Sequence, residues 1–531
     1  MKALLLYPTS EFVGKRSYEN RQDIVKDLNL DVIFRAASRE LSSLQDSKVI
    51  GKEDPYIIDI MRKIMLIPLS SEEELVYRQQ IIKDVMDSPE LIVKLYRIAK
   101  DACEDIKKFK ENAKEQKNKH LDNIGTALSS YEILQQIIHH MGILDELLTQ
   151  TESVPTSLGL KTFYERYFTE FSKEYMELLL DTMHDLEVFL NGGAVKYSAQ
   201  LGPGMKQMQI KLHSLIPSGY QKRKRTEEPS GTTTIKWYQK LFQSNTIVMK
   251  EEVLLREAHS VENAIFTYLM EFFEEFIKEM VEFFEQLHIA TAFYVGCYQL
   301  KERMCRFHLP YCMPKVVASK TKEFQFGGLY ELSMALLMQK LPTRNDLISK
   351  DQWLYIITGA NQGGKSTYLR SIGIAQVMMQ CGMFVAASGY ESNLYDNLFM
   401  HFTRREDSAM NSGRLDEEMK RMDGIVRAVT KDSMVLLNES FATTTEKEGS
   451  MIAMDLVKAF YEAGIKICMV THLLQFANDM YLLHPAHAMF LSAERKENGE
   501  RTFKILEHAP SATSFGLDLY DEIILNQRRT N

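Results

Sequence analysis

WLYIITGANQGGKS, residues 353–366, joins a short apolar run to a glycine-rich loop and decides how the C-terminal part of the chain folds. The run WLYIITG is typical of a strand buried on both faces of a parallel sheet. Gly359–Ser366 fits the pattern G-x-x-x-x-G-K-S, in which backbone N–H groups and the start of the next helix surround phosphates. In this pattern Lys365 reaches the β- and γ-phosphates, and the Ser366 hydroxyl binds Mg²⁺. The stretch predicts an α/β domain that binds a nucleotide.

Two further apolar runs follow, SMVLLNES at 433–440 and IKICMVTH at 465–472. Helical patterns separate the three runs, at about 365–381, 416–430 and 446–463. Such alternation is typical of a mostly parallel sheet with helices on both faces. Because ligands bind at the carboxyl ends of strands in these sheets, the polar residues that end the runs are candidates for the site.

Asn438 and Glu439 end the second run, and His472 ends the third. Glu439 is the predicted general base for an attacking water. An Asp usually precedes this base and holds a Mg²⁺-bound water, so with Asn438 we expect weaker Mg²⁺ anchoring and an intact base. His472 is predicted to sense a γ-phosphate. The predicted catalytic residues are thus Glu439 and His472, and the predicted Mg²⁺ ligands are Ser366, Asn438 and Glu439. The alternative is that these are ordinary polar groups at strand ends.

The N-terminal half has a different pattern. Apolar residues recur at helical spacing from about residue 56 to 190. Turn residues, short alternating stretches and a basic cluster interrupt the helices at 191–239, which predicts a small, partly β insertion. Helix resumes at about Glu251 and continues without proline to Leu309.

Composition limits the classes of protein that fit. The 531 residues carry a net charge of −8, so any contact with nucleic acid has to come from a local basic patch. No run of about 18 apolar residues occurs, which predicts no membrane span. The apolar start MKALLLY is too short for a signal peptide. Six scattered cysteines lack paired zinc-site spacing and predict reduced thiols in a cytoplasmic protein.

Several motifs together resemble the MutS family of DNA mismatch-repair ATPases. In chain order they are TGANQGGKSTYLRSIGIAQVMMQCGMFVAAS, DSAMNSGRLDEEMKRM, VLLNESFATTTEKEG, VTHLLQFA and SATSFGLDLYDE. The dense part of the resemblance covers residues 327–525. It implies an all-α core with lever helices at 1–190, a clamp-like insertion at 191–250, returning lever helices at 251–326 and an ABC-like P-loop ATPase domain at 327–531.

The resemblance also implies a function. It is that of a dimeric, ATP-switched clamp on duplex, mismatched or branched DNA that uses ATP and Mg²⁺ in mismatch repair or a related process, with downstream repair proteins as partners. Position by position, it implies a phosphate and Mg²⁺ cradle of Gly359, Asn361, Gly363, Gly364, Lys365, Ser366 and Thr367. It also implies DNA contacts by Lys222, Arg223, Lys224 and Arg225, and a signature acting across the dimer at Ser412 and Gly413.

Two departures from the family pattern bear on this reading. The helical pattern starts so early that we expect no N-terminal mismatch-reading domain, and Phe163 and Glu165, spaced like its Phe-x-Glu element, fall within a predicted helix. The Ser-Thr pair that follows SGR in the family is replaced by Leu415 and Asp416.

Two other functions share parts of this pattern, and the sequence favours only the first of them as an alternative. Asn438 and the missing Ser-Thr pair favour a nucleotide-gated dimeric scaffold that binds ATP without hydrolysing it. A transporter or chromosome-structure ATPase is disfavoured, because the chain lacks a Leu-Ser-Gly-Gly signature and has no long coiled coil between Ser366 and Asn438.

Overall fold

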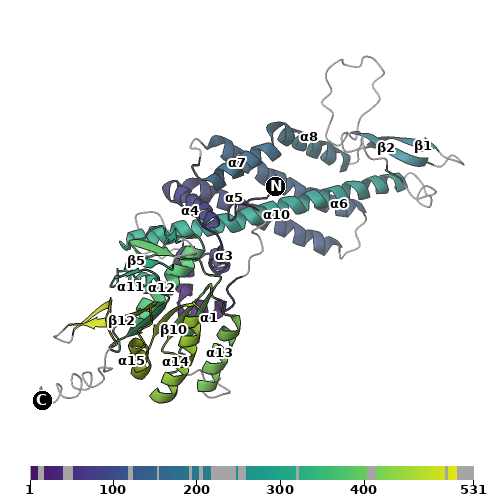
Figure 1. Cartoon of the computed structure of the whole chain (residues 1–531). Helices are drawn as coiled ribbons and strands as arrows, with labels where there is room; N and C mark the ends of the chain where they lie inside the picture. Colours follow the sequence, from purple (N-terminus) through teal and green to yellow (C-terminus); the bar gives the residue numbers. More distant parts are fainter. Residues whose placement is uncertain are drawn as a thin grey trace, which may run out of the picture. The chain divides into compact units, whose positions relative to one another are not determined.

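The computed structural model describes most of the chain (Figure 1). The described residues are 2–9, 17–39, 52–117, 123–151, 155–190, 194–201, 207–216, 247–248, 259–317, 322–403, 414–496 and 500–510. They form two compact units. The first comprises Met1–Leu5 and Glu90–Thr291, and the second Leu6–Pro89 and Ala292–Asn531. The second unit is therefore made of two separate stretches of sequence.

The first unit is mainly helical. Its helices are α5 (Pro89–Lys117), α6 (Asn123–Gln150), α7 (Leu158–Glu170), α8 (Lys173–Leu190) and the first part of α10 (His259–Arg306). Phe273, Phe283 and Leu287 of α10 are buried, as expected for an apolar stripe at helical spacing. Phe163 is also buried within α7, which fits a packing role.

The insertion predicted at 191–250 contains strands. β1 (Ala194–Leu201), β2 (Gln207–Ile216) and β3 (Ile247–Val248) pair in that order as an antiparallel sheet. Lys222, Arg223, Lys224 and Arg225 lie outside the described residues.

The second unit begins with helices α1 (Arg21–Asp27), α2 (Leu30–Ser38), α3 (Pro55–Met65) and α4 (Glu72–Asp87) and ends with the sheet-rich part of the chain. In its described part, a six-stranded sheet has the order β13-β12-β7-β11-β10-β9. All neighbouring strands are parallel except β13, which is antiparallel to β12. The strands are β7 (Leu354–Thr358), β9 (Asn397–Phe402), β10 (Ser433–Asn438), β11 (Lys466–Val470), β12 (Ala488–Arg495) and β13 (Arg501–Glu507).

Helices cover both faces of this sheet. α13 (Arg414–Ala428), α14 (Glu446–Glu462) and α15 (Leu474–Leu482) share one apolar core with side chains of β7, β10 and β11. α12 (Lys365–Gln380) packs on β10 and β11 with its Gly373 next to Leu436. Every residue of β7, β10 and β11 is buried, which explains why these strands read as continuous apolar runs. The mixed helical and sheet fold with a sheet-rich C-terminal part is confirmed.

A second, four-stranded sheet in the described residues of this unit has the order β4-β8-β5-β6. Its strands are β4 (Lys315–Val316), β5 (Phe324–Leu329), β6 (Asn345–Ser349) and β8 (Gly389–Ser392), and α11 (Leu332–Met338) lies between β5 and β6 in the chain.

The N-terminal helices α1–α4 pack on the sheet-rich part, which the sequence did not predict. A Cβ atom on Gly373 of α12 would lie 2.7 Å from a methyl group of Leu28, so the glycine lets the two segments approach closely. Arg370 donates to the carbonyl of Asp27 at 2.9 Å. Arg78 of α4, fully buried, donates to the carbonyl of Cys381 at 2.8 Å, at the end of α12. The division at residues 190, 250 and 326 remains a prediction.

No helix among the described residues is long and apolar enough to cross a membrane.

Candidate nucleotide-binding site

The loop between β7 and α12 is shaped by close contact with β12. Gly359 and Gly364 have φ values of 110° and 89°, a region that residues with a side chain rarely adopt. A Cβ atom on Gly359 would lie 2.8 Å from the backbone nitrogen of Ala493, and one on Gly363 would lie 2.8 Å from Ala493 Cβ. Both positions therefore require glycine, and the loop curves tightly into the start of α12 at Lys365.

Lys365 is buried at the base of this loop, with 4% of its surface exposed. Its ammonium group donates to the carbonyl oxygens of Gly359 and Ala360, each at 2.9 Å. Burial lowers the pKa of Lys365 to about 8, although the nearby carboxylate of Glu439 acts in the opposite direction. The site thus holds a cation whose partners are two neutral carbonyls, and phosphate oxygens would replace these partners favourably.

Ser366 and Asn438 form the second pair of the site. The Ser366 hydroxyl donates to Asn438 Oδ1 at 2.8 Å, which joins the first turn of α12 to the end of β10. Mg²⁺ prefers oxygen ligands and usually keeps several waters, so these two oxygens fit a site completed by phosphates and waters. Across the described ranges, no three His, Cys, Asp or Glu side chains gather as a metal cage.

Glu439 and His472 form the third pair. Glu439 Oε1 lies 3.0 Å from His472 Nε2, and the backbone N–H of Glu439 donates to the carbonyl of Val470 at 2.9 Å. The hydrogen bond with His472 is the main cause that lowers the pKa of Glu439, with further help from the charges of His472 and Lys365 against the opposing effect of burial. Glu439 is therefore held as a carboxylate, the form that a general base needs.

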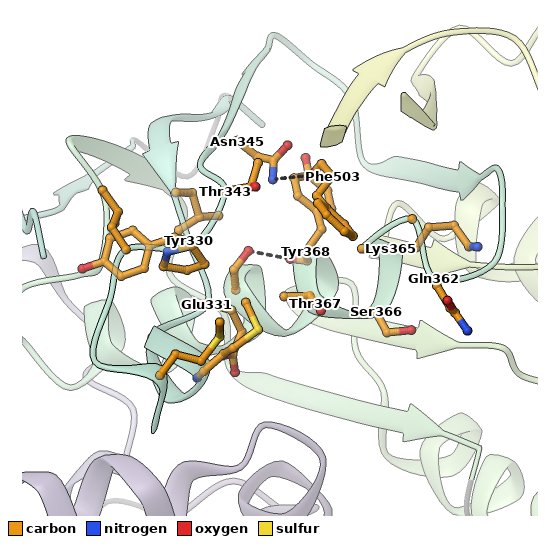
Figure 2. A pocket seen from close by; sticks show the side chains of 18 of the residues that line it. Tyr330, Glu331, Thr343, Asn345, Gln362, Lys365, Ser366, Thr367, Tyr368 and Phe503 are labelled. Carbon is orange, nitrogen blue, oxygen red and sulfur yellow. Dashed lines mark hydrogen bonds between the residues drawn. The ribbon is translucent and has the colours of Figure 1, made fainter. Parts of the chain in front are cut away.

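One cavity of about 550 Å³ contains most of the predicted residues (Figure 2). Those lining it are Asn361, Gly363, Gly364, Lys365, Ser366, Thr367 and Glu439. Gly359, Asn438 and His472 do not line it but are hydrogen-bonded to residues that do. The six-stranded sheet brings these groups together because β7, β10 and β11 run parallel and end at one edge.

The cavity also has an apolar part that the sequence did not reveal. Its lining there includes Met334, Met338, Leu341, Pro342 and Phe503. An apolar recess next to a phosphate loop suits the planar base of a nucleotide, with phosphates on the loop side.

Phe503 is an aromatic residue of this recess that lies next to the loop. Its Cβ and ring would lie 3.5 Å from a Cβ atom on Gly364, its φ is 59°, and 47% of its surface is exposed. Asn345 holds the backbone beside it, since Oδ1 of Asn345 accepts from the N–H of Ile505 at 2.8 Å and its amide donates to the Phe503 carbonyl at 3.5 Å (Figure 2). No local pattern marks Phe503, because β13 brings it to the loop from far along the sequence.

The predicted signature residues Ser412 and Gly413 lie outside the described residues. The helix that follows them, α13, begins at Arg414, and Leu415 and Asp416 are in its first turn. Asp416 pairs with Lys420 at 2.7 Å one turn later, an ordinary surface pair of a helix.

Two protein-family models match the sequence of this chain. Residues 355–527 match MutS domain V, and residues 70–307 match the MutS2 N-terminal domain. The first match covers β7, the glycine-rich loop and both polar pairs of the site. The second covers α5 to α8, the insertion and α10.

Curated relatives have the same names. A DNA mismatch repair protein MutS from Thermotoga maritima is 22% identical over 75% of this chain and 49% of its own length. One from Petrotoga mobilis is 31% identical over 31% of this chain and 19% of its own length, and a DNA mismatch repair protein MutS 2 from Halobacterium salinarum is 28% identical over 32% and 20%. The matched part of this chain thus spans at most about half the length of these relatives.

Proposed function

Because this chain belongs to the MutS family of DNA mismatch-repair ATPases, we propose that it binds ATP with Mg²⁺ in the cavity beside α12, hydrolyses it slowly and uses it to switch a dimeric clamp on DNA. The observation that carries this proposal is the convergence of Lys365, the Ser366–Asn438 pair and the Glu439–His472 pair around one phosphate loop.

In the proposed reaction the chain first binds the phosphates. The N–H groups of the loop and the N-terminal end of α12 face the phosphate oxygens, and Lys365 exchanges its two carbonyl partners for them. Ser366 and Asn438 would hold Mg²⁺ through their oxygens. When bound, the metal neutralises charge that develops on the phosphoryl oxygens.

Glu439 then accepts a proton from the water that attacks the γ-phosphate, and His472 fixes the direction of its carboxylate. The lowered pKa of Glu439 keeps its carboxylate ionised at neutral pH. Asn438 supports a slow reaction, because its neutral amide offers one oxygen to the metal without the charge of an Asp.

The decisive experiment for hydrolysis is phosphate release from Mg-ATP by the wild-type chain and by Glu439→Gln. We expect a slow but measurable rate for the wild type and none for the variant, with ATP affinity retained in both. Glu462→Gln, which changes an exposed carboxylate on α14, is the matched control and should keep the wild-type rate.

Asn438 favours one second function, the nucleotide-gated dimeric scaffold that binds ATP without hydrolysis. Equal near-zero rates for the wild type and Glu439→Gln, with tight ATP binding in both, would support the scaffold over the slow ATPase.

Binding to DNA is proposed through the insertion and its basic run Lys222–Arg225. Fluorescence anisotropy with duplex, mismatched and junction DNA, with and without ATP, tests it. Replacing all four cations by Ala should lower the affinity and reduce the dependence of log K on log salt by about 3–4. Replacing Lys107 and Lys108, which are exposed on α5, is the control. Absence of binding to any of these DNAs at low salt would refute the clamp.

We also propose an oligomeric state, a class of partner and a location for this chain. They are a homodimer in which Ser412 and Gly413 act on the partner subunit's nucleotide, contact with downstream repair proteins, and a location in the cytoplasm. Sedimentation with and without ATP tests the first, since the dimer should be favoured by the nucleotide.

A further inference from the structure

The turn that follows β10 has an unusual backbone. Glu439 has a φ of 56° and Phe441 has a φ of 67°, both in the left-handed region that residues with a side chain rarely adopt. Such conformations persist only where the surrounding structure holds them, and they are frequent at catalytic sites. The question is which groups hold this turn.

Glu418 of α13 holds it from one side. One oxygen of its carboxylate accepts from the backbone N–H of Phe441 at 2.6 Å, and the other accepts from the hydroxyl of Thr443. Only 7% of the Glu418 surface is exposed, and Phe441 is fully buried. A buried carboxylate that accepts two hydrogen bonds from one turn fixes both the position and the direction of that turn.

His401 of β9 holds the residue between the two strained positions. Its Nδ1 lies 2.7 Å from the Ser440 hydroxyl, which itself donates to the His401 carbonyl at 3.1 Å. His401 Nε2 lies 3.3 Å from the backbone carbonyl of Glu418, so α13, β9 and the turn form one buried polar network. The Glu439 carboxylate contacts His472 instead of this network, and Glu439 lines the cavity.

We propose that Glu418 is a positioning residue for Glu439, through which α13 sets the backbone of the turn that carries the catalytic carboxylate. The proposal rests on the proposed ATPase function and adds a route of control to the same site. α13 begins directly after the predicted signature Ser412–Gly413, so a displacement of α13 would move the turn that carries Glu439 through the Glu418 carboxylate and through His401.

The chemistry of the contact predicts what its loss would do. Without the carboxylate, the buried N–H of Phe441 has no acceptor, and the turn relaxes toward an ordinary backbone conformation. The Glu439 carboxylate then moves away from His472, while Lys365 and the phosphate loop keep their places on α12. Hydrolysis should therefore suffer much more than ATP binding.

The experiment compares Glu418→Ala, Glu418→Gln and the control Asp423→Asn, an exposed carboxylate that pairs with Arg427 on the same helix. In Glu418→Ala we expect kcat to fall on the order of 10²-fold, as for a misplacement of about 1 Å at a catalytic group, with the Kd for ATP changed less than about threefold. Glu418→Gln keeps an oxygen for Phe441 and should retain most of kcat, and Asp423→Asn should retain all of it.

The comparison of kcat with ATP affinity, together with rescue by Glu418→Gln, separates positioning from general damage. The proposal would be overturned by an unchanged kcat in Glu418→Ala or by a joint loss of ATP affinity and kcat in that variant. An equal loss of kcat in Glu418→Ala and Glu418→Gln would also overturn it. If Glu418→Ala does not fold, Glu418→Asp, which withdraws the oxygens by one methylene, should show the same loss of kcat.

Amide hydrogen exchange at Phe441 tests the contact without hydrolysis. We expect Glu418→Ala or Glu418→Asp to accelerate exchange there and to leave Val435 and Leu437 of β10 protected. A wild type that binds ATP but releases no phosphate would refute the proposed ATPase, and amide exchange at Phe441 would then be the test of the positioning role. Unchanged exchange at Phe441 in Glu418→Ala and Glu418→Asp would overturn that role.

Discussion

Raising the pH from 7 to 9 should weaken ATP binding about tenfold, because Lys365 loses its proton in this range. Burial lowers its pKa to about 8 in the free site. About nine in ten molecules then carry the charged ammonium at pH 7, and about one in ten at pH 9. Phosphates bind the charged form, so the apparent affinity follows this fraction, and at pH 8 about half a proton should be taken up per nucleotide.

Calorimetry with a non-hydrolysable ATP analogue and Mg²⁺ at pH 7, 8 and 9 measures the Kd. Repeating each titration in buffers of different ionisation heat gives the number of protons taken up per nucleotide. Lys365→Met should bind weakly and with a Kd that does not change with pH. Lys340→Met, at the exposed rim of the same cavity, should keep the tenfold change. A wild-type Kd that is equal at pH 7 and 9, or the same change in Lys365→Met, would refute the reasoning.

Three further predictions concern the binding of Mg²⁺, the stacking of the nucleotide base and the stability of the folded chain. Asn438→Asp should raise kcat and the affinity for Mg²⁺ by about tenfold, since a charged oxygen replaces the amide oxygen, and phosphate release across a Mg²⁺ titration measures this. Phe503→Ala should weaken ATP and ADP binding by roughly 1–3 kcal/mol, the value of base–aromatic stacking, whereas tripolyphosphate should bind unchanged. Burial lowers the pKa of Lys466 to about 7, so the unfolded state binds more protons above that pH. Between pH 7 and 8.5 the wild type should gain about 1.6 kcal/mol of unfolding free energy relative to Lys466→Met in urea denaturation, and parallel curves would contradict this.

The sequence predicted the elements that carry the site with small errors. The runs at 353–359, 433–440 and 465–472 became Leu354–Thr358, Ser433–Asn438 and Lys466–Val470. Strands buried on both faces leave a continuous apolar pattern, and only their polar ends are ambiguous by one or two residues. Once the runs are strands of one parallel sheet, their ends must meet, which is why Asn438, Glu439 and His472 were recognisable as neighbours.

Contacts between distant segments could not be predicted. Phe503 reaches the cavity because β13 pairs with β12 and Asn345 holds its backbone, and neither fact leaves a local pattern. Glu418 cannot be told from the other charged residues of the helix segment RLDEEMKR until its buried contact with Phe441 is known. Helices α1–α4 have the same periodicity as the helices after them, so their place beside α12 depends on contacts such as that of Leu28 with Gly373.

The second unit's division into two stretches of sequence also sets an order for its synthesis. A ribosome makes α1 early, but Asp27 must wait 343 positions for its partner Arg370, and Arg78 waits 303 for Cys381. The helices of the first unit, which lie between these stretches in sequence, can fold during this delay, whereas Asp27 and Arg78 make these two contacts only after α12 has emerged. The nucleotide site is thus assembled late, because every residue that lines its cavity comes after residue 328.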